Sequence, residues 1–227
     1  MHMETQRVTV EFHCHTCYSS DSLVKVEQLI ETCRAKGIDR VAITDHNRLA
    51  GALVAKIMAP EMVIVGEEIE TTDGELLGYF MSEEIPAGLS PLEVIRRLKD
   101  QGAFISVSHP FDALRSARWT MQKLETLAEH LDGMEVFNSR CIRARYNTRA
   151  AEFAQRFNLA GMTGSDAHSL IELGRSTVVL PMFEGAEELR QALKSAQLNT
   201  NLSSPFIHLV STFAKLANKA NSRTSRC

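Results

Sequence analysis

Apolar residues recur along this chain with two different periods, and the alternation of these periods predicts strands and helices in turn. Residues 7–12 alternate polar and apolar positions, as a half-buried strand does. Residues 25–36 carry apolar side chains three or four apart, and Gly37 follows as a helix terminator. The same patterns predict strands at 41–43, 62–65, 104–107, 134–137, 159–163 and 177–180, and helices at 48–58, 90–101, 121–130, 144–157 and 186–195.

The order of these elements predicts an α/β fold. Strands that alternate with helices favour a parallel sheet with right-handed crossovers. Polar residues rich in histidine and aspartate directly follow several of the strands. The carboxyl ends of the strands meet at one end of a closed barrel, so a shared site at those ends favours a barrel over an open sheet.

Four short segments contain five of the eight histidines together with other potential metal ligands. Each segment alone has ordinary explanations, such as a turn, a helix cap or a buried histidine with a hydrogen-bond partner. Their recurrence at successive strand ends makes a polynuclear metal site the leading hypothesis, because convergent imidazoles and carboxylates bind divalent ions. The segments are His13-Cys14-His15, Asp45-His46, Ser108-His109-Pro110 and Asp166-Ala167-His168, with Asp21 and Glu68 between them.

Strand geometry sorts the side chains near two of these positions. Alternation points His13 and His15 to one side of the strand and Cys14 to the other, toward the helices. The Cys-x-x-Cys pair that begins at Cys14 has no second pair to complete a structural zinc site, so buried packing is the better interpretation of this cysteine. The acidic pair Glu67-Glu68 is costly to bury without a cation, although one of the two could be solvated.

Length, charge and cysteine content narrow the class of protein. A chain of 227 residues suits one large α/β domain with a substantial core. A formal net charge of −3 gives no support for wholesale nucleic-acid binding. No apolar stretch is long enough for a membrane span, and no secretory signal is visible. Five scattered cysteines are unlike a disulfide framework, which predicts a reducing cytoplasm as the location. No obligatory protein partner is evident.

Taken in order, the polar segments resemble the motifs of the PHP (polymerase and histidinol phosphatase) family. The resemblance runs from about residue 8 to residue 195, and it implies a distorted (β/α)7 TIM-like barrel that hydrolyses phosphate esters at a metal cluster. We therefore expect a PHP barrel over residues 1–200 and a helical or polar tail over 201–227. The matching motifs are His13-x-His15-Thr16, Ser20-Asp21, Thr44-Asp45-His46-Asn47, Gly66-x-Glu68, Ser108-His109-Pro110 and Gly164-Ser165-Asp166-Ala167-His168.

The resemblance implies two or three divalent ions per chain, Mn²⁺, Fe²⁺ or Zn²⁺, with Glu68 bridging two of them. One position departs from the family pattern, because Glu75 stands where many members place a histidine. A carboxylate there would favour Mn²⁺ or Fe²⁺ over Zn²⁺. Alternatively, one metal site is altered or lost, or Glu75 faces solvent on a hairpin. The ligands carried over from the family motifs are His13, His15, Asp21, His46, Glu68, His109, Asp166 and His168.

The expected activity is hydrolysis of a small phosphorylated metabolite, a nucleotide or an oligonucleotide, as a monoester or a diester. Clustered divalent ions activate water and clamp phosphoryl oxygens, and the residues expected at the reacting centre are Asp21, His46, Glu68 and Asp166. Arginine binds phosphate with two parallel hydrogen bonds, and the expected substrate contacts are Arg115, Arg118, Arg140, Arg143 and Asn138, although the arginines could equally form a solvated face.

Two other functions stay open from the sequence. The first is a PHP module with weak or no catalysis that serves as a regulatory or scaffold domain, which the near-complete ligand set disfavours. The second is a metal-dependent amidohydrolase, because a similar barrel and cluster can attack carbonyl groups. The segment from Ser211 onward has a short amphipathic start, and it could pack on the barrel or contact an anionic partner.

Overall fold

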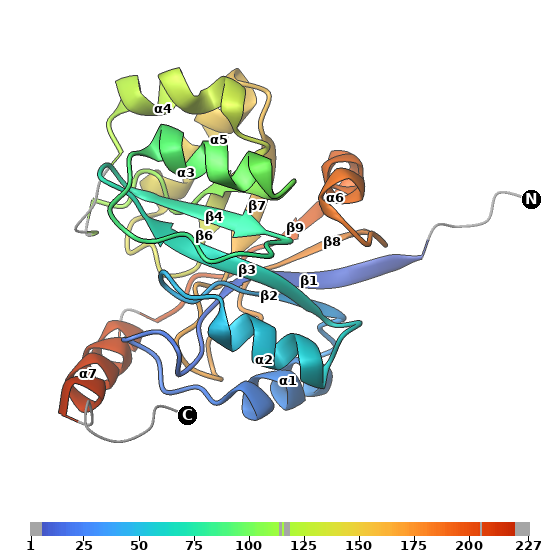
Figure 1. The fold of residues 1–227 in the computed structure, drawn as a ribbon, viewed down its shortest axis with the longest axis vertical. Helices are drawn as coiled ribbons and strands as arrows, with labels where there is room; N and C mark the ends of the chain where they lie inside the picture. The colour runs from blue at the N-terminus through green and yellow to red at the C-terminus, as the bar shows by residue number, and fades with distance from the viewer. Residues whose placement is uncertain (1–5, 114, 116–118, 205, 221–227) are drawn as a thin grey trace, which may run out of the picture.

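A mixed sheet organises the part of the chain that the computed structural model describes, which is residues 6–113, 115, 119–204 and 206–220 (Figure 1). Its strands are β1 (Arg7–Cys14), β2 (Arg40–Ile43), β3 (Val63–Glu70), β4 (Glu75–Tyr79), β5 (Phe104–Val107), β6 (Gly133–Asn138), β7 (Ala160–Gly164), β8 (Thr177–Pro181) and β9 (Gln197–Asn199). They lie in the order β7-β6-β5-β4-β3-β2-β1-β8-β9.

Helices cover the sheet on both sides, with α1 and α2 on one side and α3, α4 and α5 on the other in the view of Figure 1. Local sequence signals start two of them. Ser90 accepts a hydrogen bond from Glu93 N at the start of α3, and Thr120 accepts one from Lys123 N at the start of α4. The helices are α1 (Val26–Ala35), α2 (Ala50–Met58), α3 (Pro91–Asp100), α4 (Met121–Leu127), α5 (Ala144–Arg156), α6 (Ala186–Ala192) and α7 (Ile207–Ala220), with short 3₁₀ turns η1 (Ala128–His130) and η2 (Leu193–Ser195).

The sheet nearly closes into a barrel because the chain after β7 returns to the end of β1. His15 N donates to Ala167 O over 2.9 Å, and Ala167 N donates to His13 O over 3.2 Å. On its other edge β1 pairs with β2 in parallel. The ends of β1, β2, β5 and β7 therefore approach one another, and the predicted class, an α/β distorted TIM-like barrel, is confirmed.

The expectation of a wholly parallel sheet is wrong. The pairs β3–β4, β4–β5, β1–β8 and β8–β9 are antiparallel, and the described strands number nine where a (β/α)7 barrel has seven. The physical reason at β3–β4 is the length of the connection. A tight turn in which Thr71 N donates to Gly74 O over 2.8 Å is too short for a parallel crossover.

Strand β3 also continues further than the sequence pattern predicts. It runs to Glu70 because β4 keeps pairing with it, so Glu68 lies opposite Leu77 inside the ladder and not after the strand end. Glu67 and Glu68 are both fully buried, and the alternative that one of them is solvated does not hold. The two side chains point to opposite faces of β3, as alternation along a strand requires.

The two faces of β1 separate the site from the helical layer. His13 and His15 are buried on the inner face, and Cys14 packs with Leu29 and Cys33 of α1. The predicted burial of Cys14 is confirmed, and its Sγ donates to Ala42 O over 3.3 Å.

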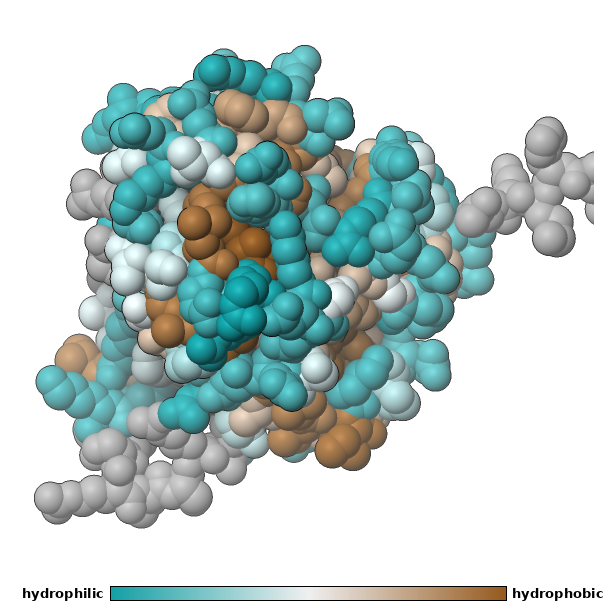
Figure 2. Space-filling view, turned by 45° about the horizontal axis from the view of Figure 1, so that its top comes forward, coloured by the Kyte–Doolittle hydropathy of each residue, from teal (hydrophilic) through white to brown (hydrophobic). Residues whose placement is uncertain are grey.

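Helix α7 falls within the predicted tail and packs beside the loop after β1 (Figure 1). The division of the chain at residue 200 stays a prediction. Among the helices described, none is both long and apolar enough to cross a bilayer. On the face shown in Figure 2, hydrophobic residues reach the surface in separate patches surrounded by hydrophilic ones.

The close approach of β7 to β1 requires a glycine at position 164. A Cβ added to Gly164 would lie 2.4 Å from His13 Cβ, far inside van der Waals contact. We expect Gly164→Ala to lower the free energy of unfolding by about 1–3 kcal/mol, as overpacking of a dense interior does. Urea denaturation measures this difference. Gly185→Ala, where nothing lies within 4 Å of the added carbon, is the control and should cost less. Equal losses for the two variants would contradict the account of barrel closure.

Candidate metal centre

The carboxylate of Glu68 lies in the middle of the site and is fully buried. Its Oε2 is 3.1 Å from His46 Nδ1 and 3.2 Å from His13 Nε2. The same oxygen is 3.4 Å from His15 Nε2, while Oε1 is 3.0 Å from His109 Nε2. One carboxylate thus faces four imidazoles that come from the ends of β1, β2 and β5, as the sequence predicts for convergent strand ends.

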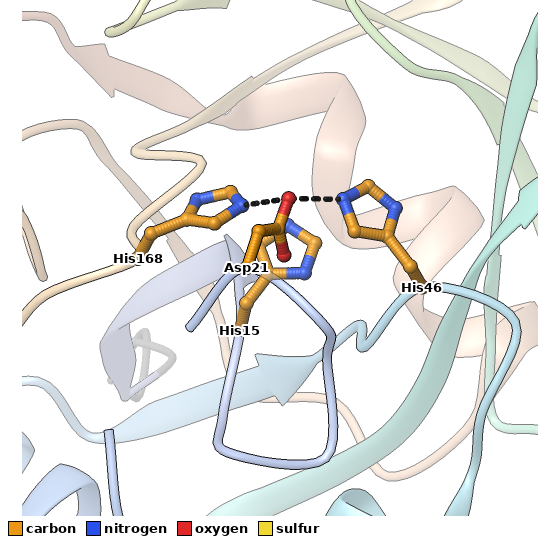
Figure 3. Close-up of side chains that lie close together, drawn as sticks. All are labelled: His15, Asp21, His46 and His168. Atoms are coloured by element: carbon orange, nitrogen blue, oxygen red, sulfur yellow. Dashed lines mark ion pairs between the residues drawn. The ribbon is translucent and has the colours of Figure 1, made fainter. Parts of the chain in front are cut away.

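Asp21 forms a second centre of convergence, on the loop after β1. Its Oδ2 is 3.2 Å from His168 Nε2 and 3.4 Å from His46 Nε2. Figure 3 shows Asp21 between these two rings with His15 beside it. A ligand atom from each of the four residues lies within 4.8 Å of the others, close enough for one ion to contact all of them.

Asp166 joins the two centres. Its Oδ1 is 3.3 Å from His15 Nε2 and 3.4 Å from His168 Nδ1. The backbone at Asp166 has φ 52°, and His109 has φ 25°. Residues other than glycine rarely adopt this left-handed region, and such strain collects at functional sites where the surrounding structure enforces it.

Glu75 at the start of β4 points into the cluster. Its Oε2 is 3.4 Å from His109 Nε2, and its Oε1 is 3.8 Å from His46 Nδ1. Its side chain is only 15% exposed, and burial together with the neighbouring Glu68 raises the pKa of its carboxyl. The alternative that Glu75 faces solvent on a hairpin does not hold. Potential ligand atoms of Glu75, His46 and Glu68 lie within 4.8 Å of one another, so these three residues form a further group that could hold an ion.

The buried groups fit a divalent cation. Among the described side chains that face the cluster, three carboxylates each have a buried oxygen without a hydrogen-bond partner, namely Asp21 Oδ1, Glu68 Oε2 and Asp166 Oδ1. Burying ionised carboxylates in this way is costly unless cations offset the charge. Oxygen and imidazole ligands together suit Mn²⁺, Fe²⁺ and Zn²⁺. The clusters of histidine and acidic side chains therefore indicate that this site binds divalent metal.

At His15 and Asp166 the electrostatics favour the ionisation states that metal ligands need. At His13 and His46, burial lowers the pKa, but Glu68 and the other nearby carboxylates outweigh it and raise the pKa of both rings. Burial and the neighbouring imidazoles of His168 and His46 hold the pKa of His15 well below its usual range, so this ring is neutral. Burial raises the pKa of Asp166, but the Arg115 guanidinium and the neighbouring His13 imidazole outweigh it and hold the pKa well below its usual range. A neutral imidazole and an ionised carboxylate are the forms that coordinate an ion.

Glu135 on β6 forms the layer behind these side chains, and sequence reasoning did not identify it as a site residue. Its Oε1 is 3.0 Å from His13 Nδ1. Its Oε2 accepts hydrogen bonds from His109 N over 2.8 Å and from Asn138 Nδ2 over 2.9 Å. A carboxylate on the far nitrogen of a histidine fixes the tautomer and orientation of that ring. The available signal was the inward position of Glu135 on an alternating strand.

Two further polar side chains support the site from behind. Asp45 of the second motif is buried, and it accepts hydrogen bonds from Thr16 N and Thr16 Oγ1, both over 2.6 Å. Ser108 Oγ donates to Glu68 Oε1 over 2.6 Å. These contacts hold the loops after β1 and β5 in place. Some polar residues of the motifs therefore face the cluster, while others, such as Asp45 and Ser108, hold the surrounding loops and ligands in position.

The predicted substrate contacts lie at different depths. Arg115 contacts Asp166, and its side chain is 21% exposed. Arg140 is buried, pairs with Glu172 over 3.4 Å, and also contacts His168 Nδ1. Asn138 is fully buried and also donates to Asp166 Oδ2 over 3.4 Å.

The structure places only one of the remaining two arginines. Arg143 is exposed at the start of α5, and Arg118 lies outside the described residues. Of the five predicted substrate contacts, Arg115 thus combines a contact to the cluster with partial exposure, while Arg140 and Asn138 sit behind the cluster.

Comparison with known families and sequences agrees with this geometry. Residues 11–134 match the model of the PHP domain, and residues 144–198 match that of the PHP-associated region. The chain is 38% identical over 174 residues to the uncharacterized protein MJ0417 of Methanocaldococcus jannaschii, an alignment that covers 74% of this chain and 69% of that protein. It is 37% identical over 142 residues to MJ1587 of the same organism, covering 57% of this chain and 81% of that protein.

Solved structures share the fold at low sequence identity. A two-domain protein from Bacteroides vulgatus, containing a predicted PHP-like metal-dependent phosphoesterase, superimposes with a TM-score of 0.70 at 20% identity, over 93% of this chain and 70% of that one. The lesion-specific endonuclease PfuEndoQ of Pyrococcus furiosus superimposes with a TM-score of 0.62 at 16% identity, over 88% and 60% of the two chains. The family model covers more than half of this sequence, so the chain belongs to the PHP family.

Proposed function

We propose that this protein hydrolyses phosphate esters at a cluster of two or three divalent ions. The observation that carries the proposal is the buried carboxylate of Glu68, which faces four imidazoles and keeps an oxygen without a hydrogen-bond partner among the described residues. A carboxylate with its two oxygens directed at different imidazoles suits a bridge between two ions. Membership of the PHP family and the fold shared with structures described as a phosphoesterase and an endonuclease support a hydrolase of this general kind.

The proposed ligands divide into overlapping groups. His15 and His46 each occur in two groups. Because one ring nitrogen binds only one ion, the same nitrogen of His15 or His46 cannot bind the ions of both groups. Asp166 and His109 lie beside these groups and are available as additional ligands of a third ion. The groups are His15, Asp21, His46 and His168, then His13, His15 and Glu68, and finally His46, Glu68 and Glu75.

Bound divalent ions supply Lewis-acid chemistry here, polarising a phosphate group and acidifying water. The protein holds the ligands in place through Glu135, whose carboxylate fixes His13 and the backbone of His109. Arg115 is positioned to contact phosphoryl oxygens because it is partly exposed beside Asp166. Arg140 is buried against the ring of His168, so we assign it to orienting that ring and not to a direct substrate contact.

The family departure at Glu75 favours Mn²⁺ or Fe²⁺ as the resident ion. Carboxylate oxygen is a harder ligand than imidazole nitrogen, and hard ligands favour these ions over Zn²⁺. The observation in support is the place of Glu75, beside His46 and His109 at the partly exposed side of the cluster. The alternative of a PHP module without catalysis is less favoured, because a scaffold has no chemical need for so many convergent ligands.

Glu68→Ala should abolish phosphate-ester hydrolysis, with a loss on the order of a thousandfold or more, because the variant lacks the central ligand of the cluster. His15→Ala should have the same effect for the same reason. Turnover of p-nitrophenyl phosphate with Mn²⁺ measures the loss, and circular dichroism checks the fold. Glu70→Ala, at the exposed end of the same strand, is the control and should keep wild-type activity. Wild-type turnover in a metal-replete Glu68→Ala sample would count decisively against this site.

Glu75→His should shift the metal preference toward Zn²⁺, because it exchanges a carboxylate for an imidazole at the same place on β4. Activity measured against Mn²⁺, Fe²⁺ and Zn²⁺ in turn, for the wild type and the variant, gives the two metal profiles. Identical profiles would mean that Glu75 does not bind an ion.

A further inference from the structure

Helix α7 contacts the metal centre although it lies far along the chain from the predicted ligands. Its inner face consists of Ser211, Ala214, Lys215 and Asn218, which share one side of a helix by their spacing. Ala214 is buried, while Phe213 and Leu216 between these positions are exposed. The helix therefore packs with a defined face against the barrel, and that face carries polar side chains.

The inner face of α7 holds the loop that carries Asp21. Asn218 Nδ2 donates to Ser20 O over 3.0 Å and to Ser22 O over 3.2 Å, the two carbonyls that flank this aspartate. One turn earlier, Lys215 Nζ lies 3.5 Å from Asp21 Oδ2. The helix thus fixes the loop on both sides of a predicted ligand and places a cation at the ligand itself.

Arg140 anchors the other end of the same face. Its Nη2 donates to Ser211 Oγ over 2.8 Å, while its Nη1 contacts His168 Nδ1. Helix α7 is therefore connected to two predicted ligands, Asp21 and His168, and both belong to the same potential ion site.

Lys215 differs from the arginines of the site in its exposure. Its side chain is 61% exposed although its ammonium group reaches Asp21, whereas the side chain of Arg140 is 3% exposed and already paired with Glu172. A solvent-exposed lysine with a flexible stem can follow an incoming ligand over a short distance. It is therefore a cation beside the cluster that a substrate can meet on entering.

The position of Lys215 becomes unfavourable for a cation once Asp21 also binds a divalent ion. An ammonium group and a metal ion that face the same carboxylate oxygen repel each other, and an anion that contacts both relieves the repulsion. A phosphate group is such an anion. A terminal phosphomonoester carries up to two charges near neutral pH, since its second pKa is about 6, and a diester carries one, so an added cation favours the monoester.

We propose that helix α7 is part of the substrate site and that Lys215 binds the phosphoryl oxygens of a phosphomonoester held at the Asp21 end of the cluster. This inference rests on the proposed phosphoesterase function and deepens it by naming the substrate class. In this arrangement the phosphate group lies between Lys215 and the cluster. The leaving group extends away from α7, toward the side of the cluster at which His46 is partly exposed.

The test compares Lys215→Ala, Lys215→Arg and the control Lys194→Ala in the Mn²⁺-loaded full chain. Lys194 is an exposed lysine of η2, outside the proposed site. Calorimetry with inorganic phosphate measures anion binding, and steady-state kinetics with p-nitrophenyl phosphate and bis(p-nitrophenyl) phosphate compare a monoester with a diester. Lys215→Ala should weaken phosphate binding about tenfold and raise KM for the monoester by a similar factor, with little change in kcat, as loss of a charged hydrogen bond does.

The same measurements should find Mn²⁺ affinity retained in Lys215→Ala, a smaller rise in KM for the diester than for the monoester, and phosphate binding restored in Lys215→Arg. Lys194→Ala should match the wild type throughout. If Lys215→Ala lowers the melting temperature, Lys215→Met replaces the alanine variant in every assay, because methionine keeps the aliphatic part of the side chain.

Unchanged phosphate binding in Lys215→Ala and Lys215→Met, beside a wild type that hydrolyses phosphate esters, would overturn this inference and leave the proposed function standing. Equal losses for the monoester and the diester would overturn the assignment of the substrate class. A wild type that neither binds Mn²⁺ nor hydrolyses either ester would overturn the proposed function, and this inference with it.

Discussion

Buried negative charge at the carboxyl end of the barrel is the constraint on which the rest of this structure depends. Glu68 and Asp166 are fully buried, and Asp21 is nearly so. Burial raises the pKa of Glu68, but the imidazoles of His13 and His46 outweigh it and hold the carboxyl ionised. Each of the three carboxylates also keeps one buried oxygen without a hydrogen-bond partner among the described residues. Ions that bind here would stabilise the folded chain as well as serve chemistry.

The barrel collects this charge through the way in which it closes. The chain after β7 pairs with the end of β1, which brings Asp166 and His168 against His13 and His15. Glu135 then links the ends of β1, β5 and β6 through three separate contacts. The geometry of the site therefore depends on barrel closure, because a change that separates β1 from β7 also separates the proposed ligands.

The convergence of most of the proposed ligands could be predicted from the sequence because they occur in short local motifs at strand ends. His13 and His15 are two residues apart on one strand, so alternation alone places both rings on one face. The position of Glu75 could not be predicted in the same way. It depends on β4 turning back antiparallel to β3, and a pattern of apolar residues does not fix the direction of pairing.

Local sequence patterns could not predict the roles of residues that contact the cluster from distant parts of the chain. Glu135 is 122 residues from His13, and a single glutamate on an alternating strand has no signature of its own. Arg140 has the residue type of a phosphate contact, and only tertiary burial against Glu172 and His168 shows that it lies behind the cluster. Lys215 lies in a segment whose composition predicts only an amphipathic start, and its contact with Asp21 follows from the docking of α7.

The measurement that tests the metal cluster most directly is a crystal structure of the Mn²⁺-saturated chain with anomalous scattering recorded at the manganese edge. The account predicts two or three anomalous peaks per chain, with Glu68 in contact with two of the ions and with His13 and His168 among the ligands. A single peak, no peak, or ions bound away from Glu68 would contradict it.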